Sequence, residues 1–99
     1  MKYKKGEFGY WWTVEKGNKD IEGKVYAGSI ACYCSSLTSL KGAPKKVSGY
    51  FYCHDNALTT LEGAPEKVGD GFDCSYNKLT SLKGAPEKLV VIFIATTTL

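Results

Sequence analysis

The chain has 99 residues, 43% of them hydrophobic, and a net charge of +3 carried by thirteen lysines without a single arginine. This length suits one domain, so residues 1–99 are expected to fold as a unit. Nucleic-acid sites rely on arginine for bidentate contacts, so the composition argues against a nucleic-acid partner. No apolar run is long enough to span a membrane, and the first residues hold no apolar signal core. We therefore expect a cytoplasmic protein with no membrane partner.

Residues 1–25 predict an N-terminal β-hairpin. Residues 7–14 are rich in aromatic side chains that favour strands, residues 16–20 form a turn cluster, and residues 21–26 alternate like a second strand. We expect Trp11 or Trp12 to cover the open end of the segment that follows, because a terminal repeat otherwise exposes its core. A ligand-stacking platform is the alternative interpretation of the two tryptophans.

Residues 26–88 are three gapless copies of one 21-residue unit: YAGSIACYCSSLTSLKGAPKK, VSGYFYCHDNALTTLEGAPEK and VGDGFDCSYNKLTSLKGAPEK. A fixed period of this length is typical of a solenoid, in which each unit buries its apolar face against the next. The alternation around each phenylalanine or isoleucine predicts a short strand. The GAP tripeptide predicts an extended or polyproline return segment, because proline and glycine disfavour a helix interior. The columns expected to point inward are Ile30/Phe51/Phe72, Cys32/Cys53/Cys74, Leu37/Leu58/Leu79 and Leu40/Leu61/Leu82.

The third copy carries the pattern F-x-C-x-x-N-x-L-x-x-L, which resembles the core L-x-L-x-x-N-x-L-x-x-L of leucine-rich repeat proteins. It is similar in particular to the short 21-residue bacterial and phage type, and the resemblance covers residues 26–88. The resemblance implies a mainly β, right-handed solenoid with a parallel sheet on its concave face. It also implies that Asn77 bonds the backbone of neighbouring units. The first copy departs from the pattern, because Ser35 replaces the asparagine and Cys34 adds a second thiol.

The cysteines are expected to be thiols rather than disulfides. Three of them recur at the repeat period, and parallel side chains on neighbouring strands suit a disulfide poorly. Buried cysteine also acts as a small hydrophobic residue. Cys34 breaks the pattern and is the candidate for redox or metal chemistry. With His54 and Asp55 it supplies three ligands, one fewer than structural zinc requires, so no metal or cofactor is expected.

The outward strand positions gather rings on the predicted concave face. The candidate binding residues are Tyr33, Tyr50, Tyr52, His54 and Asp73. Tyrosine is a preferred contact residue at protein interfaces. Cross-strand packing that stiffens the sheet is the alternative. On the opposite side, one column holds Lys46/Lys67/Lys88 and another alternates as Lys41/Glu62/Lys83, so the second favours ion pairs between units. The uniform lysine column is expected to be simply solvated, and an anion site is the alternative.

Residues 89–99 begin a fourth copy, with Phe93 aligned to Phe72, and then depart from it. Ile92 and Ile94 then fall at outward positions, which makes both faces of the segment apolar. Such a strand at a sheet edge invites pairing unless it is covered. We expect Ile92 and Ile94 to form the edge of a homodimer, and a fold-back of the threonine-rich tail is the alternative.

The sequence offers no catalytic group, because Cys53 and His54 are strand neighbours whose side chains face opposite ways. We therefore expect a non-enzymatic protein, and two functions remain. The first is a protein-interaction module that binds an unidentified protein through the tyrosine-rich face or the C-terminal edge; the resemblance implies an adaptor or an inhibitor of a host protein. The second is a weak anion or nucleic-acid binder that uses the lysine column with Lys2, Lys4 and Lys5. Salt separates them, since phosphate binding weakens steeply as salt rises.

Overall fold

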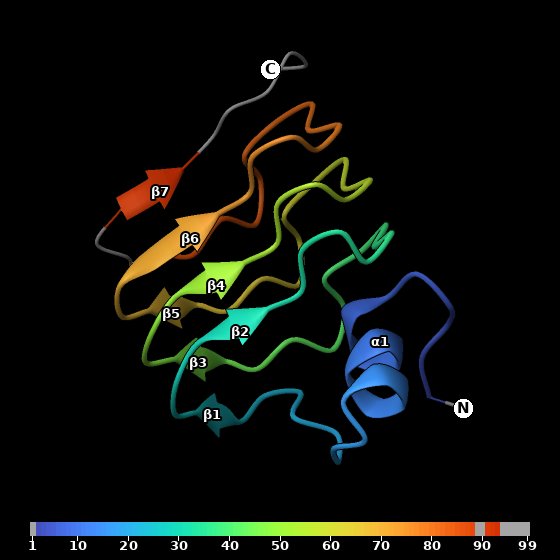
Figure 1. Cartoon of the computed structure of the whole chain (residues 1–99). Coiled ribbons are helices and arrows are strands. Elements are labelled where there is room, and N and C mark those ends of the chain that lie inside the picture. The colour runs from blue at the N-terminus through green and yellow to red at the C-terminus, as the bar shows by residue number, and fades with distance from the viewer. Residues whose placement is uncertain (1, 89–90, 94–99) are drawn as a thin grey trace.

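The computed structural model describes residues 2–88 and 91–93 (Figure 1). The fold is mainly β, as predicted. Within the described residues, one helix precedes a series of short strands. These elements are α1 (Phe8–Glu15), β1 (Val25–Tyr26), β2 (Ile30–Ala31), β3 (Lys46–Val47), β4 (Phe51–Tyr52), β5 (Lys67–Val68), β6 (Gly71–Asp73) and β7 (Val91–Phe93).

The strands form two parallel sheets, and the chain alternates between them. One sheet has the order β1-β3-β5 and the other β2-β4-β6-β7. Val25, Lys46 and Lys67 pair in register, as do Ile30 and Phe51, so the pairing follows the 21-residue period of the sequence. Each repeat unit thus gives one strand to each sheet, and the units stack with α1 at one end and β7 at the other (Figure 1). The return segment, expected to be extended or polyproline-like, leads from the GAP tripeptide into the strands of the first sheet, such as β3 at Lys46–Val47.

The space between the sheets is filled by the predicted inward columns. The phenylalanine, cysteine and first leucine columns are buried throughout, and the rings of Phe51 and Phe72 stack with centroids 5.4 Å apart. Leu82 is the exception, because it is 41% exposed whereas Leu40 and Leu61 are fully buried. The prediction that Leu82 points inward is wrong. It belongs to the last of the three units, and no further unit within the described residues stacks on it.

Asparagine side chains tie successive units together. The Oδ1 atom of Asn56 accepts hydrogen bonds from the N–H groups of Ser35 (3.1 Å) and Leu37 (2.8 Å), and its Nδ2 donates to the carbonyl of Cys32 (3.0 Å). Asn77 makes equivalent bonds one unit further along. Both side chains reach back to the preceding unit. The first unit has no predecessor to reach, which explains why serine suffices at position 35.

Glycine in the GAP tripeptide is required by both conformation and stacking. Gly63 has a φ of +94° and Gly84 a φ of +90°, a left-handed region that side chains with a Cβ rarely occupy. A Cβ on Gly63 would lie 2.8 Å from the carbonyl carbon of Leu40, and one on Gly84 would clash with the backbone nitrogen of Glu62. Any other residue there would push neighbouring units apart.

The predicted N-terminal β-hairpin is wrong. Phe8–Glu15 is the helix α1, and Val25–Tyr26 pairs in parallel with β3 instead of antiparallel with an earlier strand. A helix places Phe8 and Trp12, four residues apart, on one face. Both are buried, and Phe8 packs 5.8 Å from the ring of Phe51. Burial of two large rings against the first repeat unit overrides the strand preference of the aromatic sequence.

The capping role expected of a tryptophan is confirmed. Trp12 belongs to the buried core, and Trp11 packs against that core from its edge. The Trp12 ring meets Tyr26 edge-on at 5.4 Å, and its Nε1 donates to the carbonyl of Lys19 (3.1 Å). Backbone N–H groups at the start of α1 also donate to the first unit, among them Phe8 to the Ser39 carbonyl (3.0 Å).

Tyr3 anchors the segment that precedes α1. Its ring is 5% exposed, and its hydroxyl lies 2.8 Å from carboxylate oxygens of both Asp20 and Glu22. Lys2 Nζ lies 2.8 Å from Asp20 and 2.9 Å from Glu22. Burial raises the pKa of Tyr3. The hydrogen bond from Lys2 is the main reason that the pKa of Asp20 falls from 3.8 to about 2.

The register predicted for the fourth copy is wrong by one residue. Phe72 pairs with Ile92, and Asp73 with Phe93, so the interval from Phe72 to its partner is one residue shorter than the repeat period. A slip of one residue exchanges the two faces of a strand. Ile92, predicted to face outward, therefore occupies the inward column and packs against the core. Ile94 lies outside the described residues.

Candidate interaction surface

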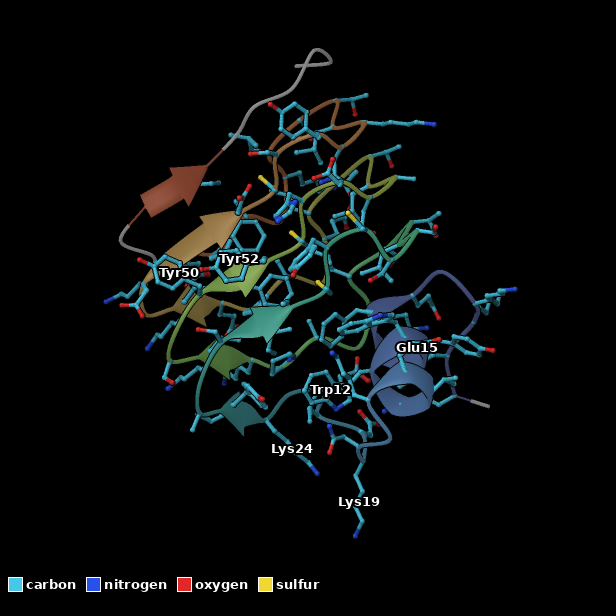
Figure 2. All side chains as sticks on the ribbon, viewed as in Figure 1. Trp12, Glu15, Lys19, Lys24, Tyr50 and Tyr52 are labelled. Carbon is cyan, nitrogen blue, oxygen red and sulfur yellow. The ribbon has the colours of Figure 1, made fainter. Side chains whose placement is uncertain are left out.

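Four rings form a continuous group that we call the aromatic strip: Tyr33, Tyr50, Tyr52 and His54. The buried side chains of Phe51 and Cys53 fix the orientation of this segment, because alternate residues of a strand face opposite sides. Tyr50, Tyr52 and His54 consequently lie on the outward face of the β2-β4-β6-β7 sheet. Figure 2 shows the first two side by side at β4.

The rings contact one another in series along the strip. Tyr50 and Tyr52 stack with centroids 5.4 Å apart and planes 9° from parallel. Tyr52 meets His54 edge-on at 6.4 Å. Tyr33 stacks on His54 at 4.7 Å and 6°. Each ring of the strip thus contacts at least one other ring.

The strip remains open to solvent. Tyr33 is 48% exposed and Tyr50 39% exposed. Within the described part of the chain, no hydrogen bond occupies the hydroxyl groups of its three tyrosines. Three phenolic groups that can donate or accept are thus available to a partner.

Two carboxylates flank the strip. Asp73 pairs in register with Tyr52, as the predicted column requires, and its Oδ1 accepts a hydrogen bond from the N–H of Ser75 (3.0 Å). Asp55 Oδ2 lies 2.6 Å from His54 Nδ1. Asp55 was not among the predicted binding residues. Its repeat column gave no signal, because positions 34, 55 and 76 hold Cys, Asp and Tyr, and the positive φ that they share is seen only in the structure.

The cysteines offer little nucleophilic or metal chemistry. Cys32, Cys53 and Cys74 are buried, and burial raises the pKa of each thiol, that of Cys74 to about 11. The reactive form is the thiolate, so these groups are inert at neutral pH. Cys34 is exposed. Among the described residues, no three His, Cys, Asp or Glu side chains are grouped to hold a metal ion.

The lysine column lies on the other sheet. Lys46 pairs with Lys67 in parallel register, and Lys67 forms a bridge with Lys88. A surface hollow of about 480 Å³ lies beside these lysines. Of the N-terminal lysines predicted to act with this column, Lys2 pairs with Asp20 and Glu22 instead.

No described helix has the length and apolar character needed to cross a membrane. Comparisons of the chain with protein-family models, with curated proteins and with solved structures found no match in any of the three.

Proposed function

We propose that the chain is a short leucine-rich repeat solenoid of right-handed coil that acts, without catalysis, as a protein-interaction module. The repeat assignment is supported by the 21-residue pairing period, by the buried columns and by the backbone bonds of Asn56 and Asn77 between units. The module works in the cytoplasm. In the bacterial or phage setting that the sequence resemblance implies, it serves as an adaptor or as an inhibitor of a host protein.

The observation that carries the binding proposal is the aromatic strip, which is internally stacked yet exposed. Rings that are already ordered lose little conformational freedom on binding, so more of the contact energy appears as affinity. The stacked tyrosine faces are turned toward each other, which leaves edges and hydroxyl groups for the partner. A partner surface with apolar area and carbonyl or carboxylate acceptors fits this arrangement. Cross-strand packing that stiffens the sheet is the alternative account of the same stacking.

A quantitative pull-down tests the proposal with three baits. The first is the natural chain, the second carries Tyr50→Ser with Tyr52→Ser, and the third carries Tyr76→Asn. Tyr76 is a matched control, because it is a tyrosine 64% exposed outside the strip, and asparagine tolerates its positive φ.

We expect one protein to be retained by the natural chain and by the Tyr76 variant and lost by the double variant. With that protein purified, the double variant should bind about 30-fold more weakly, which corresponds to about 2 kcal/mol. Its melting temperature should stay nearly unchanged. Equal retention by all three baits, or a fall in stability that parallels the loss of affinity, would contradict the proposal.

The lysine column supports a second candidate function, weak anion binding. The specific observation is that its members stand in register beside a hollow. The two functions use different sheets and respond differently to salt. Anion binding should weaken strongly as ionic strength rises, whereas contacts centred on the aromatic strip should change little.

A further inference from the structure

The strand β2 has one edge that no other described strand covers, because it stands at the end of the order β2-β4-β6-β7. The N–H groups of Ile30 and Cys32 donate to the carbonyls of Tyr50 (2.9 Å) and Tyr52 (2.8 Å) on the β4 side. In a parallel pair only alternate residues of a strand bond a given neighbour, so the N–H and C=O groups of Ala31 point to the open edge.

The N-terminal cap covers a different part of the first unit. The N–H of Thr38 donates to the carbonyl of Gly6 (2.8 Å), and the N–H of Phe8 donates to the carbonyl of Ser39 (3.0 Å). The start of α1 and the residues before it thus pair with the segment that follows β2 in the chain. Within the described part of the chain, the backbone hydrogen bonds of this cap do not include Ala31. The edge of β2 therefore stays open beside a covered segment.

Nothing in the sequence of this edge protects it from pairing. Residues 27–33 read AGSIACY and hold neither a charged residue nor a proline. Natural sheets guard their open edges with lysine, proline or a bulge. Ser29, Ala31 and Tyr33 are all exposed. A row of free N–H and C=O groups at strand spacing is complementary to another extended polypeptide, because a peptide backbone repeats donors and acceptors at the same spacing.

A hollow of about 360 Å³ lies where the free edge ends. Tyr10 and Trp11 of α1 line one side, and residues 35–38, which follow the strand, line the other. Ser36 has a φ of +56°, whereas the corresponding residues of the other two units have no positive φ. The backbone of the first unit thus departs from the repeat at the hollow. The aromatic lining and the volume suit one large apolar side chain.

We propose that β2 binds an extended segment of a partner protein, which adds to the sheet as a further strand and places one large apolar side chain in the hollow. This inference rests on the protein-interaction function proposed above and names the form of the partner. Main-chain hydrogen bonds to the edge supply affinity, and the hollow supplies specificity. Tyr33, the member of the aromatic strip that lies next to this edge, contacts the same segment, so the edge and the strip form one surface.

A second folded copy of the chain fits this edge less well. In Figure 1, α1 and the chain between α1 and β1 lie beyond β2 along the stacking direction of the units. A second copy that approached β2 would meet these segments first. A single extended segment is thin enough to reach the edge beside them.

Selection from a random peptide library displayed on phage, with the natural chain as bait, supplies the probes, which are then synthesised with a fluorescent label. Ala31→Pro removes the N–H at the free edge, a change that an edge strand tolerates because this group bonds nothing within the sheet. Ala31→Thr is the matched control, because it alters the same side chain and keeps the N–H. Tyr10→Ala removes part of the wall of the hollow.

We expect the enriched peptides to share a large apolar residue and to bind the natural chain and the Ala31→Thr variant alike. The Ala31→Pro variant should bind them at least about tenfold more weakly, because a hydrogen bond is replaced by a proline ring at the edge. Tyr10→Ala should also weaken binding. In the natural chain a bound peptide should slow hydrogen exchange at the Ala31 amide, which nuclear magnetic resonance measures even if the proline variant does not fold.

A failed selection, equal binding by a folded Ala31→Pro variant, or unchanged exchange at Ala31 would overturn the inference. Peptides whose affinity falls only in the double variant of Tyr50 and Tyr52 would place binding on the aromatic strip, which overturns the edge site and leaves the proposed function intact. A dimer of the natural chain that Ala31→Pro dissociates in light scattering would show that a second copy occupies the edge and would overturn the choice of partner. The proposed function is refuted separately by the pull-down, whose three baits leave β2 unchanged.

Discussion

Replacing Asn77 by alanine should destabilise the fold strongly, because its side chain serves backbone groups of two units. Asn77 is 6% exposed. Its Oδ1 accepts from the N–H of Leu58 at 3.0 Å, and its Nδ2 donates to the carbonyls of Cys53 and Cys74, both at 3.1 Å. Alanine removes these bonds and leaves buried backbone groups without the partners that they now have.

A buried polar group that loses its partner costs about 1–3 kcal/mol. Two or three such groups, with some relaxation, give an expected loss of about 3–5 kcal/mol in the free energy of unfolding. This is a large fraction of the roughly 5–15 kcal/mol that stabilises a small domain. Urea denaturation followed by circular dichroism measures the loss, and an unchanged m-value would show that only stability has changed.

Ser35→Asn is the informative control. It restores the repeat consensus in the first unit, yet the amide has no preceding unit to bond. We expect the free energy of unfolding to change by less than about 0.5 kcal/mol. A gain comparable to the loss in the Asn77 variant would refute the reasoning that these side chains act by reaching back. A loss below about 1 kcal/mol for Asn77→Ala would refute the proposed magnitude.

Three further predictions concern the thiols, the acid response and the C-terminal edge. In the folded protein a thiol reagent should label Cys34 quickly and the three buried cysteines slowly, and mass spectrometry measures the rate of labelling. Rapid labelling of all four cysteines would contradict the observed burial. The lowered pKa of Asp20 gives stability that is present above pH 3.8 and lost as the pH falls toward 2. Asp20→Asn should therefore flatten the dependence of melting temperature on pH within that window. An unchanged slope would rule out a contribution of Asp20 to the acid response. A homodimer built on the edge of β7 should appear as a doubled mass in light scattering at micromolar concentration, and the Ile94→Lys variant should have the mass of a monomer. A monomer mass for both the natural chain and the variant would contradict the dimer and favour the alternative, in which the threonine-rich tail folds back over this edge.

The candidate surface was predictable to the extent that it follows from strand alternation. Once Phe51 and Cys53 are placed inward by the repeat, Tyr50, Tyr52 and His54 must face outward, and the predicted strip is what the structure contains. The stacking of Tyr33 on His54 depends on side-chain rotation across neighbouring strands, which the pattern does not specify. The proximity of Asp55 to His54 depends likewise on a positive φ at the turn.

The period and the inward positions other than Leu82 were determined by the sequence alone, because a repeated pattern leaves one register in which successive units bury the same residues. Only the tertiary structure determined the conformation of the two ends of the chain. Each end segment contacts a single neighbouring unit, and it has no second copy in the sequence with which it could be compared. At the N-terminus, burial of Phe8 and Trp12 against the first unit turned an expected hairpin into α1. At the C-terminus, pairing with β6 drew Ile92 into the core, one residue earlier than the period predicts. In both places the packing of large apolar side chains outweighed the local pattern, as burial outweighs the weaker preferences of the backbone.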